Sequence, residues 1–65
     1  MYVAIRFRGQ PMFFVKFIAG MRSIEWTADK RHATKLIDPA SVIRTAKAYG
    51  YNGAFVYGYN GAFVF

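Results

Sequence analysis

The sequence predicts a single α+β domain over residues 1–65, in which an antiparallel sheet of three to five strands packs on one main helix. Three observations predict it: two alternating apolar segments near the N-terminus, a capped helix at about 39–49, and a strand after that helix. A duplicated segment at the C-terminus adds either one strand or a hairpin to this plan.

Residues 2–8 and 12–19 alternate with a period of two, and Gly9 and Pro11 mark a turn between them, so we expect an N-terminal hairpin. Its buried face is expected to be uniformly apolar and to consist of Val3, Ile5, Phe7, Phe13, Val15 and Phe17. Its other face mixes aromatic and basic side chains, namely Tyr2, Arg6, Arg8, Phe14 and Lys16. The sequence leaves open which face the helix covers.

The segment after the hairpin predicts a short third strand over 23–27, with Ile24 and Trp26 pointing inward. Thr27 then offers a hydroxyl cap for a helical turn within 28–34. This turn and Lys35 form the most basic stretch of the chain.

The main helix is predicted by local signals at both ends. Asp38 is a good N-cap, Pro39 suits the first helical position, and Gly50 suits the position after the helix. The apolar stripe expected to face the sheet is Val42, Ile43, Ala46 and Tyr49.

Residues 49–56 recur residue for residue as 57–64, which indicates a tandem duplication, by natural slippage or by deliberate engineering. Because eight is even, sliding a strand by one repeat returns each side chain to its original face. Two arrangements stay open. Both Asn-Gly pairs form turns and strand 54–59 folds onto 62–65, or the two copies compete for one position in the sheet.

In the second arrangement the spare strand can pair with another molecule and make a homo-oligomer by strand exchange. The self-association residues predicted on this basis are Phe55, Val56, Tyr57, Phe63, Val64 and Phe65.

Nine Lys or Arg against three acidic residues give a net charge of +6, which favours nucleic acid or an acidic protein surface as partner. The alternative is that the charge only keeps an aromatic-rich domain in solution. The candidate binding residues are Arg6, Arg8, Phe14, Lys16, Lys30, Arg31 and Lys35.

Catalysis has little support in the sequence. The chain has no Cys and one His, and its three carboxylates are scattered, so we expect no enzyme, metal site, cofactor or small-molecule substrate. His32 and Asp29 could form an oriented imidazole, but an exposed His in a basic turn is the favoured interpretation. No secretory leader or membrane-length apolar segment is evident, so we expect a cytoplasmic location without a membrane span.

Two resemblances add to this interpretation. Trp26-Thr27-Ala28-Asp29, followed by Ala33 and Leu36 before an alanine-spaced helix, resembles small bacteriophage ββαβ accessory proteins over about residues 24–46. That resemblance implies a regulator acting by binding and transfers no catalytic residue. Gly-Ala-Phe-Val and the aromatic after it resemble part of the RNP1 strand of RNA-recognition sheets, with Asn52 where that strand has Lys or Arg.

The function predicted from the sequence is therefore that of a small, non-enzymatic basic binding protein. It would be a phage-like regulator acting on nucleic acid or on a nucleic-acid-associated host protein. The alternative is a protein-binding or self-assembling module that works through the duplicated strand.

Overall fold

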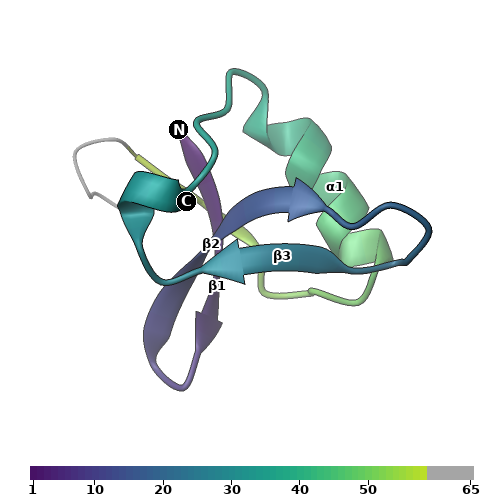
Figure 1. The fold of residues 1–65 in the computed structure, drawn as a ribbon, viewed down its shortest axis with the longest axis horizontal. Coiled ribbons are helices and arrows are strands. Elements are labelled where there is room, and N and C mark those ends of the chain that lie inside the picture. The colour runs from purple at the N-terminus through teal and green to yellow at the C-terminus, as the bar shows by residue number, and fades with distance from the viewer. Residues whose placement is uncertain (59–65) are drawn as a thin grey trace.

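Four antiparallel strands form one sheet in the order β3-β2-β1-β4, and one helix covers a face of it (Figure 1). The structure is a computed structural model that describes residues 1–58. Its elements are β1 (Tyr2–Phe7), β2 (Gln10–Phe17), β3 (Ile24–Thr27), the 3-10 turn η1 (Lys30–His32), α1 (Pro39–Ala48) and β4 (Phe55–Tyr57). The predicted α+β class is confirmed. Of the hairpin predicted for 54–59 and 62–65, the first arm contains β4, and the second arm lies outside the described residues.

The hairpin turn between β1 and β2 consists of two residues, Arg8 and Gly9, with φ angles of 54° and 80°. This left-handed pair matches the twist of the flanking strands, although Arg lacks the freedom of Gly at such an angle. β2 therefore begins earlier than predicted. Gln10 lies opposite Phe7, and Pro11 belongs to the strand rather than to the turn.

The two-residue turn also determines which side chains share a face. Ala4 lies opposite Phe13 and Ile5 opposite Met12, so odd-numbered residues of β1 share a face with even-numbered residues of β2. The predicted grouping of Phe13 with Val3 and Ile5 is therefore wrong. Phe13 lies with Ala4 on the opposite face.

A β-bulge changes the pattern again towards the end of β2. The pairing with β3 shifts between Phe14 and Lys16, so that Phe14 and Phe17 lie on the same face with ring centroids 5.0 Å apart. Phe7, which was predicted to be buried, lies next to the hairpin turn with 57% of its surface exposed.

The face beneath α1 carries the larger core. It contains Val3, Phe14, Ile24, Ala46 and Ala54 as buried residues. Trp26 packs against them, which confirms that Ile24 and Trp26 point inward. The helix ends are as predicted: the Asp38 carboxylate accepts a hydrogen bond from the Ser41 amide at 3.4 Å, and Gly50 follows the helix at φ 104°.

The opposite face of the sheet is apolar as well. Tyr2, Ala4, Phe13 and Phe55 form a second buried cluster there, with Ala33 and Tyr57 packed against it. Both faces of so small a sheet are therefore used for burial, which is how a chain without disulfides obtains enough packed surface.

The connection 33–36 leads the chain from one face of the sheet to the other. Ala33 packs against the second cluster and Leu36 against the helix-side core. Between them, the Thr34 amide donates to the Phe14 carbonyl at 3.0 Å, and the Leu36 amide donates to the Met1 carbonyl at 2.7 Å. η1 and α1 consequently lie on opposite sides of the strands, at the left and right of Figure 1.

Candidate functional site

The basic turn η1 is organised by a single carboxylate. Asp29 accepts hydrogen bonds from the Arg31 amide at 2.9 Å and from the Arg31 guanidinium, whose Nη2 lies 2.9 Å from Oδ2. Asp29 is thus the cap of this turn, in place of the predicted Thr27, whose hydroxyl instead accepts from the Asp29 amide at 3.1 Å. The turn is therefore held by its own side chains and presents its basic residues outward.

The same contacts determine the charge of the turn. Hydrogen bonds from Arg31 lower the pKa of Asp29 from 3.8 to about 2, and the carboxylate in turn raises the pKa of Arg31. His32 Nε2 lies 3.6 Å from the same carboxylate. Asp29 is therefore ionised at neutral pH and orients Arg31, whose side chain remains 87% exposed.

A concave region lies beside this turn and is lined mostly by cations. It has a volume of about 380 Å³ and is bounded by Tyr2, Lys30, Arg31, Ala33 and Lys35. We call it the basic hollow. The three cations lie within residues 30–35. The hydrogen bonds of the 33–36 connection hold this segment against the sheet, so the positions of the three cations are fixed by the fold.

Two further contacts place cations beside β4 on the same face. Lys30 Nζ lies 5.5 Å from the centroid of the Tyr57 ring, and the Arg6 guanidinium lies 5.5 Å from that of Phe55. The Phe55 and Tyr57 rings are 6.4 Å apart. Arg6 of the hairpin and Lys30 of the basic turn, which are far apart in sequence, are thus brought to one side of the sheet.

The aromatic residues of this face are mainly packing material. Among the described residues of this face, Tyr2, Phe13 and Phe55 are at most 9% exposed and Tyr57 is half-buried. Phe14, a predicted binding residue, lies on the other face beneath α1 and is 5% exposed. The predicted grouping of Phe14 with the basic hairpin residues is therefore wrong, because the two-residue turn places the even-numbered residues at the start of β2 on the face that α1 covers.

The remaining predicted binding residues lie at the margins. Lys16 is exposed on the same face as Arg6 and lies opposite Glu25 of β3. Arg8 lies in the hairpin turn, roughly 20 Å along β1 from Tyr2 at the rise of an extended strand, with its guanidinium 5.3 Å from the Phe7 ring. Arg8 is thus separated from the basic hollow.

Three other cations lie on or against the helix. Arg22 donates to the Ala48 carbonyl at 3.1 Å and lies 5.3 Å from the Tyr49 ring, so it stabilises the end of α1. Arg44 and Lys47 are exposed on the helix itself. Substitution of Arg44 and Lys47 therefore serves as a control for removing charge from the basic hollow.

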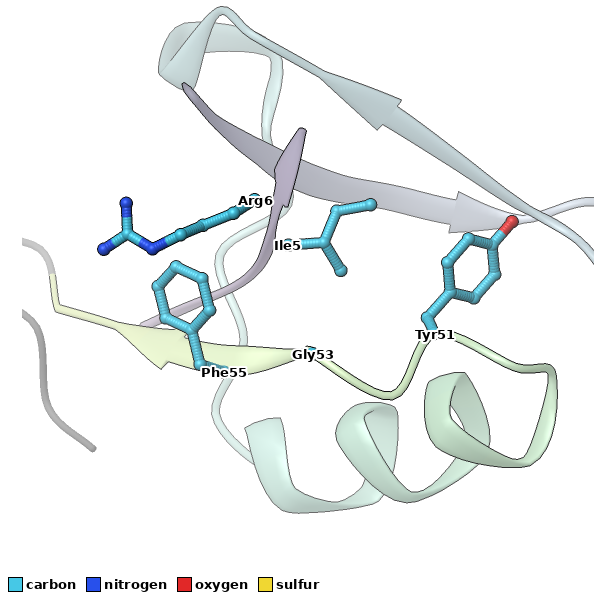
Figure 2. Close-up of a pocket in the computed structure, with 5 residues that line it drawn as sticks. All are labelled: Ile5, Arg6, Tyr51, Gly53 and Phe55. Atoms are coloured by element: carbon cyan, nitrogen blue, oxygen red, sulfur yellow. The ribbon is translucent and has the colours of Figure 1, made fainter. Parts of the chain in front are cut away.

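A second hollow lies where β4 leaves β1, and Figure 2 shows the residues around it. It has a volume of about 480 Å³ and is lined by Ile5, Arg6, Tyr51, Gly53 and Phe55. β4 pairs with β1 only over residues 2–4, and the space opens beyond that pairing. The Arg6 guanidinium lies above the Phe55 ring, at the opposite side of the space from Tyr51. Tyr51 is the lining residue with a titratable hydroxyl, and a hydrogen bond with Ser23 lowers the pKa of that hydroxyl.

The predicted self-association residues divide between described and undescribed parts of the chain. Phe55 and Val56 are buried in β4 and Tyr57 is half-buried there, all three paired within the chain's own sheet. Phe63, Val64 and Phe65 lie outside the described residues. In residues 1–58, no three His, Cys, Asp or Glu side chains gather as a metal site would require, and no helix has the length and apolarity needed to cross a membrane.

Comparison of the chain with protein-family models, with curated proteins and with solved structures finds no match.

Proposed function

We propose that this chain is a small, non-enzymatic protein that binds nucleic acid, with the basic hollow as its principal phosphate-binding site. The observation that carries the proposal is the convergence of Lys30, Arg31 and Lys35 on one concave surface. Arg6 and Lys16 lie on the same side of the sheet and extend the positive surface beyond the hollow.

The chemistry of the site favours phosphate over base recognition. Lys and Arg bind phosphate oxygens as charged donors, and Arg31 is already oriented by Asp29. Stacking on bases would need exposed rings, whereas the aromatic side chains of this face are mostly buried. Binding is therefore expected to tolerate many sequences and to depend strongly on salt.

This behaviour fits an accessory regulator of the kind that the sequence resembles. Such a protein would occupy or mask nucleic acid rather than act on it chemically. An acidic protein surface is the competing partner, because the same cations could bind clustered carboxylates.

Titration of labelled single- and double-stranded oligonucleotides over a salt series tests the proposal. Neutralising three to five phosphates predicts a log–log slope of about −2 to −4.5, with single strands at the shallow end. Little difference is expected between oligonucleotides of unrelated sequence. A slope near zero, or no binding at low salt, would contradict nucleic-acid binding. If a polyglutamate peptide that carries the same total charge as the oligonucleotide displaces it from the protein, the acidic-protein alternative is favoured.

A further inference from the structure

The position of β4 beside β1 is defined by three residue pairs. Val56 lies opposite Val3 at the centre, Phe55 lies opposite Ala4, and Tyr57 lies opposite Tyr2. Val3 and Val56 are the largest fully buried side chains of the described residues, at 0% and 1% exposure. β4 therefore buries its central valine completely in the core beside β1.

The second copy of the repeat matches the requirements of this position. Residues 59–64 are identical to residues 51–56, so they would supply the same Val at the centre and the same Phe beside it. These two segments also begin with the same residue, Tyr51 in the first copy and Tyr59 in the second. Tyr51 packs edge-on against the Trp26 ring at 5.3 Å, and the identical Tyr59 could make that contact.

One position differs between the copies, because Phe65 corresponds to Tyr57. Tyr57 contacts its neighbours through its ring. The ring lies edge-on to Phe13 at 5.2 Å and beneath Lys30 Nζ at 5.5 Å. A phenylalanine ring offers the same edge and the same face, so Phe65 is suited to both contacts.

We propose that β4 is a position for which the two copies compete within one molecule, so that residues 59–65 can replace residues 51–57. The replacement preserves every side-chain face because the shift is an even number of residues. The connection from α1 to β4 lengthens by eight residues when the second copy is in place. A loop that is little more than doubled costs little chain entropy, so both arrangements are accessible.

Exchange within one molecule is favoured over exchange between molecules. A second copy tethered by a few residues has an effective concentration of about millimolar at the β4 position of its own sheet. A second molecule reaches that level only in a concentrated solution. The proposal is independent of nucleic-acid binding, since its contacts lie in β4 and its neighbours.

Substitution of the central valines tests the exchange. In Val56→Asp the first copy can no longer occupy β4, and the second copy is expected to replace it, lowering Tm by only about 5 °C. Val64→Asp alone is expected to shift Tm by less than about 3 °C. The double variant leaves neither copy fit for the position, and we expect a fall of at least about 15 °C or loss of cooperative unfolding. If Val56→Asp alone is as unstable as the double variant, or the double variant as stable as Val56→Asp, the exchange does not occur.

Nuclear Overhauser contacts from Val3 identify which copy occupies the position. They are expected to involve Val56 in the unmodified chain and Val64 in Val56→Asp, at any protein concentration. Contacts to Val64 that appear only as the concentration rises, together with a dimeric mass, would contradict exchange within one molecule. Absence of such contacts in a folded Val56→Asp chain would contradict the proposal altogether.

Discussion

Lys30 Nζ lies 5.5 Å from the centroid of the Tyr57 ring, which links the basic hollow to the last described strand of the sheet. Lys30 lines the hollow, whereas Tyr57 belongs to β4 and packs edge-on against Phe13. A ligand that contacts Lys30 therefore lies close to the Tyr57 ring, and its binding should change the chemical environment of that ring.

Nucleic-acid binding is accordingly expected to shift the ring resonances of Tyr57 and the amide resonances of η1. Amides of Arg44 and Lys47 on α1 should shift much less, because the helix covers the opposite face. Heteronuclear NMR during an oligonucleotide titration measures both sets together. Larger shifts on α1 than on η1 and Tyr57 would show that the ligand binds elsewhere.

The Asp29 contacts predict a dependence of stability on pH. The pKa of Asp29 is about 2 in the folded chain against 3.8 ordinarily, so its ionised form favours folding above about pH 4. This contribution is lost as the pH falls from about 4 to 2. Asp29→Asn keeps a good cap but removes the charge, so it should lower Tm at pH 7 and have little effect at pH 2. A Tm difference that stays constant over this range would contradict the assignment.

The hairpin turn contains a strained residue. Arg8 has φ 54°, an angle at which Asn is tolerated far better than Arg. Arg8→Asn is expected to stabilise the fold by about 0.5 kcal/mol after loss of the exposed contact with the Phe7 ring. Chemical denaturation measures this gain. Arg8→Val serves as the control and should destabilise by at least about 1 kcal/mol, because a β-branched side chain fits this angle poorly. Equal stability of the two variants would argue against strain at Arg8.

The parts of the fold that depend on local chemistry could be predicted from the sequence. The helix at 39–49 is found within one residue, because Asp38, Pro39 and Gly50 act on their immediate neighbours. The four strands are likewise found where alternation or turn residues mark them. The candidate residues of the basic turn also converge, since they lie within a few residues of one another.

The parts that depend on turn geometry and distant contacts could not be predicted. The two-residue turn places an arginine in a left-handed conformation, which its residue type does not indicate. The bulge near Val15 then brings Phe14 and Phe17 to one face, against strict alternation. The side of the sheet taken by the basic turn depends on the hydrogen bond from Thr34 to Phe14, which links residues far apart in the chain.

The central claim, that the basic hollow binds nucleic acid, is tested most directly by two double variants of equal charge. Lys30→Gln with Lys35→Gln removes two charges from the hollow, and Arg44→Gln with Lys47→Gln removes two from α1. Thermal unfolding confirms that both variants fold, and oligonucleotide affinity is then measured over a salt series. We expect the hollow variant to bind at least about tenfold more weakly at low salt, with a salt slope reduced by about 1.5 to 2, and the helix variant to change little. Equal losses in the two variants would show that net charge alone drives binding, and would contradict a site in the hollow.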